Sequence, residues 1–312
     1  MSSANVTLAV RYQDSFSKAV IKNVVVVLLG IFINYINGGI IHTFSKHQIF
    51  YTNPRYILFI HLVVNDMIQL VLSIILFIIS YTIYKINVSI CCVLILFTLV
   101  TTENTPLNLA CMVVECYIAI CIPLRHSQIC TIRRTLMLVG FIWATSMLSV
   151  LPDVFITLAT EPLDFFSSKV FCIRNTVFPN PVIIQKRDFT YLVFLIIVWF
   201  TIFYCYFKIL FTAKTASRDA KKARNTITLH GFQLVLCMTT YAAPQLLNVV
   251  QRLFPRNQTD FLFAYYIIVQ MLPRSISPII YGVRDNTFRN YLRCYLMCRI
   301  TAVWETFPRP LN

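Results

Sequence analysis

Three charged side chains lie inside long apolar stretches of this 312-residue sequence: Asp66, Glu103 and Arg274. A charge in an apolar segment is costly, so it is usually kept for binding a ligand, an ion or a proton. Glu103 would either stay protonated or attract a cationic ligand, and its alternative role is a structural hydrogen bond to a neighbouring helix. Arg274 precedes Pro278 by four residues, which places both on one stripe of a helix.

The rest of the sequence gives no pattern for catalysis. It has no paired carboxylates in a polar context, no metal-ligand spacing and no glycine-rich phosphate loop. We therefore predict that the chain is not an enzyme and needs no metal or cofactor. The buried charges alone would also fit a solute transporter, but the sequence lacks the internal repeats on which many transporters are built.

The composition indicates a membrane protein. Hydrophobic residues make up 58% of the chain and charged residues only 12%, against about 25% charged in an average soluble domain. The mean hydropathy is +0.71. The net charge of +15 could suggest a nucleic-acid partner, but the basic residues cluster in the loops between apolar segments. That distribution indicates membrane topology, with the lipid bilayer and not nucleic acid as the partner.

The apolar residues gather into seven segments, each long enough to cross a bilayer core, which takes about 20 residues of helix. The segments are 23–44, 56–83, 90–114, 134–152, 189–211, 227–250 and 261–283. None has the alternating pattern of a membrane β-barrel. We predict an all-α fold, a seven-transmembrane helix bundle over residues 23–283.

The residues after the last segment, 284–312, form a basic tail. Four apolar residues of the tail share one helical face: Phe288, Leu292, Tyr295 and Leu296. This pattern predicts a short amphipathic helix lying on the membrane surface. Its two cysteines, Cys294 and Cys298, are either palmitoylation sites or free thiols.

Two features predict the orientation. The loops after the first, third and fifth segments and the tail are strongly basic, which places the tail in the cytoplasm. Glycosylation sequons begin at Asn5, Asn87 and Asn257, all on the opposite side, although Asn87 lies close to the membrane. We expect a multi-pass protein of the plasma membrane with an extracellular N-terminus, residues 1–22.

The third segment ends in the run Glu-Cys-Tyr-Ile-Ala-Ile-Cys-Ile-Pro-Leu-Arg-His, residues 115–126. This run resembles the Asp/Glu-Arg-Tyr-x-Ala-Ile-Cys-x-Pro-Leu run of rhodopsin-like G-protein-coupled receptors, and of their odorant branch in particular. Similar matches occur in the other segments, at Asn34, Trp143, Tyr206–Leu210, Lys222–Thr226, His230 and Pro273–Arg284. Several details look like the odorant receptors of fish.

The resemblance assigns places to the buried charges and to two cysteines. Asp66 would face a polar pocket that often binds sodium in the family, and Arg274 would border it. We predict an Asp66–Arg274 ion pair in which the guanidinium replaces sodium, the alternative being that Arg274 faces a water-filled cavity alone. The resemblance also implies a disulfide between Cys91 and Cys172, with Cys92 as the rival partner.

The resemblance further implies an odorant receptor, which binds a small odorant between the helices and activates a heterotrimeric G protein of the stimulatory type. The candidate ligand-binding residues are Glu103, Asn104, Asn108 and Tyr241. The candidate G-protein-coupling residues are Glu115, Cys116, Tyr117, Arg125, Tyr206, Lys222 and Tyr281.

Cys116 departs from the family pattern, because it stands where the family carries arginine. Cysteine has neither the reach nor the donors of a guanidinium. The departure leaves open altered coupling, a decoy receptor or a decaying gene copy. Two other classes also stay open, a seven-helix ligand-gated channel and a solute transporter.

Overall fold

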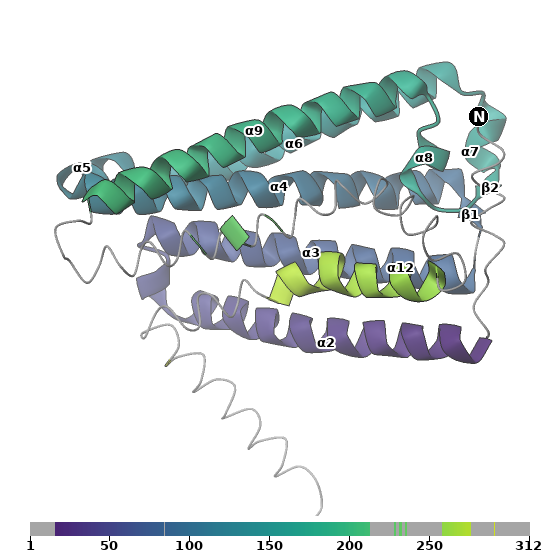
Figure 1. The fold of residues 1–312 in the computed structure, drawn as a ribbon, viewed down its shortest axis with the longest axis horizontal. Coiled ribbons are helices and arrows are strands. Elements are labelled where there is room, and N and C mark those ends of the chain that lie inside the picture. The colour runs from purple at the N-terminus through teal and green to yellow at the C-terminus, as the bar shows by residue number, and fades with distance from the viewer. Residues whose placement is uncertain are drawn as a thin grey trace, which may run out of the picture.

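The computed structural model describes residues 16–83, 85–212 and 258–275, with the single residues 228, 231, 232, 235 and 290 (Figure 1). Several predicted features lie outside the described residues: Asn5, Lys222, Tyr241, Asn257, Tyr281, Cys294, Cys298, most of the sixth segment and the tail helix.

Five long helices correspond to the first five predicted segments. They are α2 (Phe16–Lys46), α3 (Pro54–Thr82), α4 (Val88–Cys121), α6 (Ile132–Thr160) and α9 (Pro181–Thr212). All five are long and apolar enough to cross a membrane, which confirms those predictions. The helix α12 (Gln258–Tyr266) and the π-helical turn η2 (Ile267–Met271) belong to the seventh segment.

The starts of three helices follow from polar residues in the sequence. The side chain of Asn53 accepts a hydrogen bond from the Arg55 amide at the start of α3, and Pro54 occupies the first helical position. Asn87 caps α4 through the Ser89 amide in the same way, and Thr131 caps α6. These caps fix where each connecting loop ends.

Helix α4 lies at the centre of the described bundle. It packs against α3 on one side and against α6 and α9 on the other, while α2 packs on the far side of α3 (Figure 1). One buried cluster joins α2, α3, α4 and α9 around Leu62, Leu109 and Ile209. Another, which includes Phe77 and Met271, ties η2 to α2 and α3.

Short elements connect the helices. On one side lie the 3-10 turn η1 (Gln48–Phe50) and the helix α5 (Pro123–Ile129). At the opposite end, α7 (Leu163–Ser167) and α8 (Arg174–Val177) accompany a two-stranded antiparallel pairing of β1 (Ile86–Asn87) with β2 (Lys169–Val170).

The connection between α6 and α9 is shorter than the sequence suggested. We expected a loop over residues 153–188, but α6 continues to Thr160 and α9 begins at Pro181. Asp153 and Lys186 are therefore helical. The polar residues at these helix ends pair with one another, so their charge does not mark the start of a loop.

Candidate functional site

Glu103 lies on the face of α4 that looks toward α6 and α9. Its side chain is almost completely buried, with 3% exposed. One carboxyl oxygen, Oε1, accepts a hydrogen bond from the Ser149 hydroxyl of α6 at 3.2 Å. The other, Oε2, is buried without a hydrogen-bond partner within the described part of the chain. Glu103 therefore has one oxygen, Oε1, in a hydrogen bond and a second, Oε2, that a bound ligand could reach as a hydrogen-bond donor.

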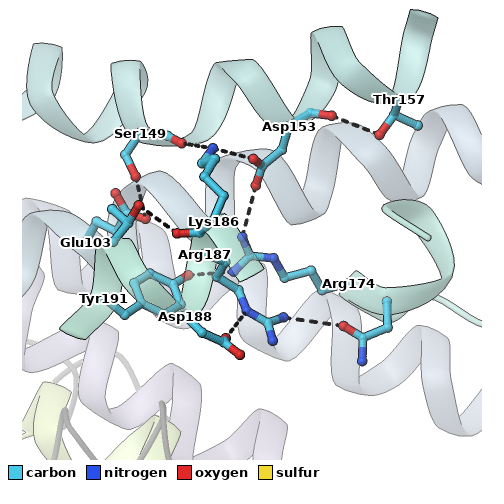
Figure 2. A network of polar contacts seen from close by, with 11 residues as sticks. Glu103, Ser149, Asp153, Thr157, Arg174, Lys186, Arg187, Asp188 and Tyr191 are labelled. Carbon is cyan, nitrogen blue, oxygen red and sulfur yellow. Dashed lines mark hydrogen bonds and ion pairs between the residues drawn. The ribbon is translucent and has the colours of Figure 1, made fainter. Parts of the chain in front are cut away.

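Beside Glu103, a second carboxylate binds two cations (Figure 2). Asp153 of α6 is 1% exposed, and its Oδ2 accepts a hydrogen bond from Arg174 of α8 at 3.0 Å. Its Oδ1 binds the Lys186 ammonium of α9. Lys186 also donates to the Ser149 carbonyl at 2.7 Å, and Arg174 donates to the Tyr191 hydroxyl. We call Asp153, Arg174, Lys186 and Tyr191 the outer network.

None of the sequence patterns predicted the outer network. Its members were assigned to a long loop or to the first turn of a span, where charges are expected. The signal that could have revealed it is the position of Asp153, directly after the last residue of the predicted fourth segment, where one further helical turn buries it.

The outer network is fixed from several sides. The predicted disulfide between Cys91 of α4 and Cys172 is confirmed, with 5.6 Å between the two Cα atoms, and Cys92 remains a free thiol. The Val88 amide donates to the Ser168 carbonyl at 3.0 Å. The disulfide also sits in a buried apolar cluster that includes Phe178 and Ile183.

Asn104 and Asn108 face α3, although Asn104 directly follows Glu103. Successive residues of a helix point about 100° apart, so adjacent polar residues serve different neighbours. Asn104 donates to the Asn65 side chain at 3.3 Å, and Asn108 donates to the Leu58 carbonyl at 3.0 Å. Both asparagines thus hold α3 to α4, and ligand contact by either stays a prediction.

Asp66 and Arg274 are both buried, as the sequence suggested. The Arg274 guanidinium donates to the Val269 carbonyl at 3.3 Å. Within the described residues, the recorded salt bridges do not include one between Asp66 and Arg274. The pairing of these two residues therefore stays a prediction.

The other end of α4 carries Glu115, which also has two side-chain partners. Glu115 is 5% exposed. Its Oε2 accepts a hydrogen bond from the Arg55 guanidinium of α3 at 3.0 Å, and its Oε1 lies 3.1 Å from the His126 Nε2 of α5. The adjacent Cys116 is 3% exposed and lies in an apolar cluster with Cys205 of α9.

The remaining described coupling candidates gather at this same end. The Tyr117 ring lies 6.0 Å from the Tyr204 ring of α9, and Tyr206 follows on the same helix, partly buried. Arg125 is exposed on α5. The structure thus brings Glu115, Cys116, Tyr117, Arg125 and Tyr206 to one end of the bundle, opposite the outer network.

The chain matches known proteins over most of its length. Residues 36–281 match the 7 transmembrane receptor (rhodopsin family). Odorant receptor 131-2 of Danio rerio is 30% identical over 88% of this chain and 85% of that receptor. Adenosine receptor A2b of Homo sapiens is 23% identical over 67% of this chain and 71% of that receptor. Melatonin receptor type 1B-B of Danio rerio is 24% identical over 63% of this chain and 57% of that receptor.

Proposed function

This chain belongs to the rhodopsin family of seven-transmembrane receptors and to its odorant-receptor branch, and from that premise we propose that it binds a small odorant and activates a heterotrimeric G protein. The observation that carries the proposal is the similarity to the Danio rerio odorant receptor along nearly the whole chain. The protein is a multi-pass membrane receptor and not an enzyme.

The odorant binds between the helices, beside the outer network. Glu103 supplies the polar contact there, because its Oε2 is a buried acceptor that makes no hydrogen bond within the described residues. A ligand that donates a hydrogen bond from a hydroxyl or an amine group satisfies this oxygen. Binding then favours one of two receptor arrangements, a population shift that opens the opposite end to the G protein.

The orientation follows from chemistry on each side. The Cys91–Cys172 disulfide belongs in an oxidising compartment, so the outer network faces the cell exterior and the plasma membrane is the site of action. The opposite end carries Arg125 and the basic loops, which suit the cytoplasm. The N-terminus is then extracellular and the tail cytoplasmic, and by family analogy the G protein is the stimulatory type.

A receptor that binds but does not signal is the second candidate, and Cys116 favours it. A buried cysteine cannot reach a G protein as arginine does. The ligand-gated channel has less support, since such a channel would place the N-terminus inside the cell. A glycan on Asn5 or Asn257 would exclude it.

Cyclic-AMP signalling in transfected cells tests the proposal. A panel of small polar odorants is applied to the wild type, Cys116→Arg and Glu103→Gln, with surface staining as a normaliser. We expect a response from the wild type and about tenfold weaker potency for Glu103→Gln, which replaces the buried carboxyl group with an amide. Glu161→Gln is the matched control, because Glu161 ends α6 away from Glu103.

The outcomes separate the candidates. Response only in Cys116→Arg would mean that the cavity is intact and natural coupling is lost. If neither the wild type nor Cys116→Arg responds at full surface level, the result would contradict coupling to the stimulatory G protein. Equal potency of Glu103→Gln and Glu161→Gln would remove Glu103 from the ligand site.

A further inference from the structure

Glu115 joins three elements at the cytoplasmic end, and within the described residues its side-chain partners are Arg55 and His126. We propose that Arg55 and His126, acting through Glu115, are the positioning residues that hold α5 against α3 and α4. This goes beyond the proposed function by assigning a restraint to residues outside the family's arginine position, and it rests on that function only for its effect on signalling.

The geometry supports two simultaneous contacts. Each carboxyl oxygen of Glu115 has a partner of its own, Arg55 on Oε2 at 3.0 Å and His126 on Oε1 at 3.1 Å. A carboxylate accepts and does not donate, so the His126 Nε2 must carry a proton. Because Glu115 is almost completely buried, the surroundings have a low dielectric constant and the hydrogen bonds are stronger than in water.

The helix α5 depends on these contacts because apolar packing does little for it. None of its side chains is buried, and Leu124 at its start is 92% exposed. A second side chain that contacts α5 is Arg134 of α6, which donates to the Gln128 carbonyl at 2.7 Å and to the Ile129 carbonyl at 3.4 Å. The His126–Glu115 contact is thus the side-chain link from α5 to α4.

Position 116 does not compete for Glu115 in this protein. Cys116 lies in the apolar cluster between α4 and α9, together with Val113 and Ile209. A cysteine there offers no cation, so the carboxylate is bound from α3 and α5. A Cys116→Arg substitution would put a second guanidinium next to Glu115, which would compete with His126 and weaken the hold on α5.

Native-state proteolysis of the purified full chain in nanodiscs tests this directly. Trypsin cleaves after Arg125, which is exposed on α5, but only when the helix opens enough to enter the protease. We expect cleavage after Arg125 to be about tenfold faster in Glu115→Gln and in His126→Ala than in the wild type, because opening sets the rate. Arg55→Lys, which keeps the charge, should stay near wild type, whereas Arg55→Ala should not.

Two controls show that a faster cut is local. Glu161→Gln, the same substitution at the outer end of α6, should leave the rate after Arg125 unchanged. Cleavage after Lys169, in β2 beside the disulfide, should be equal in all variants if the bundle is intact. Wild-type rates after Arg125 in Glu115→Gln and His126→Ala would overturn the proposal, and so would equal acceleration at Lys169.

Basal cyclic-AMP, normalised to surface level, separates this inference from the proposed function. Positioning of α5 for coupling would be supported by a several-fold change of basal cyclic-AMP in Glu115→Gln and in Arg55→Ala. Arg55→Lys should then stay near the wild-type level. If every variant and the wild type are silent, coupling to the stimulatory G protein fails, while the proteolysis rates still decide whether Glu115 holds α5.

Discussion

Two carboxylates at opposite ends of the bundle are both buried and both paired, but their surroundings differ. Asp153, at the end with the disulfide, and Glu115, at the end with α5, are both almost completely buried, and each binds two nitrogen-bearing side chains from two other elements. A lone buried carboxylate is unfavourable, and paired cations with good geometry remove most of that cost. The local chemistry is alike at the two ends.

The surroundings differ in what else fixes the bound elements. Around Asp153, the disulfide, the β1–β2 pairing and a buried apolar cluster fix the outer connection independently. Around Glu115, the short helix α5 has no buried side chain. An ion pair is therefore a stable link where the surrounding packing supports it, and a contact that can open where the packing does not. A receptor needs a stable ligand end and an end that can rearrange.

Removing the disulfide should have the largest effect of the changes considered. Cys91→Ser removes a cross-link between residues 81 apart in sequence. Losing a cross-link that closes a loop of that size lowers the free energy of unfolding by about 4 kcal/mol. Thermal unfolding in detergent should show a strongly lowered midpoint, and surface expression should fall. The end that carries the disulfide would then lose the support that distinguishes it from the end that carries Glu115.

The neighbouring thiol supplies the control for this change. Cys92→Ser alters the adjacent residue, which is a free and partly buried cysteine, and should leave both measurements near wild type. Equal losses in Cys91→Ser and Cys92→Ser would mean that packing of the helix end and not the disulfide stabilises the outer loop.

Asp153→Asn should come next. The change leaves Lys186 and Arg174 without their carboxylate in a largely buried place, which usually costs 3–5 kcal/mol. Lys186 keeps partial access to solvent, so we expect about 2 kcal/mol. The measurement is the thermal midpoint, side by side with Glu115→Gln. A larger loss for Glu115→Gln than for Asp153→Asn would contradict this order, because it would make the contacts of Glu115 the more stabilising ones.

The sequence predicted the parts of the fold that depend on composition alone. Runs of about 20 apolar residues located the first five helices, and the family resemblance paired Cys91 with Cys172 correctly. The ends of the helices were less predictable, because a charged residue can continue a helix when a neighbouring element supplies a side chain of opposite charge. Asp153 is the clearest case: its two cations lie 21 and 33 residues further along the chain.

Contacts between helices depend on the direction in which each side chain points, which a single sequence does not fix. Glu103 and Asn104 were assigned to one ligand cavity, yet they face opposite neighbours. The binding of Glu115 by Arg55 was likewise missed, because the resemblance directed attention to Cys116 and not to the cation 60 residues earlier. The residue types were informative, and the pairings needed the structure.

The ion pair between Lys22 of α2 and Asp260 of α12 should contribute least to stability. It shows how much of the contribution depends on burial of the carboxylate. The two atoms lie 2.8 Å apart, but the Asp260 side chain is 54% exposed. The hydrogen bond from Lys22 holds the pKa of Asp260 below its ordinary value. A lowered pKa in the folded state means that the pair stabilises the protein above the unfolded pKa. This contribution is lost as the pH falls through the folded pKa, hence only below about pH 4.

We therefore expect Asp260→Asn to lower the thermal midpoint by at most about 2 °C at pH 6, since exposed pairs contribute little. The difference from wild type should shrink once the pH falls below about 4 and should vanish below the lowered folded-state pKa of Asp260. Lys22 also lies 5.6 Å from the Phe263 ring, and this contact survives in the variant. A difference that persists unchanged in acid would show that the substitution acts through packing around Phe263. A loss as large as that of Asp153→Asn would show that burial of the carboxylate does not decide the strength of these pairs.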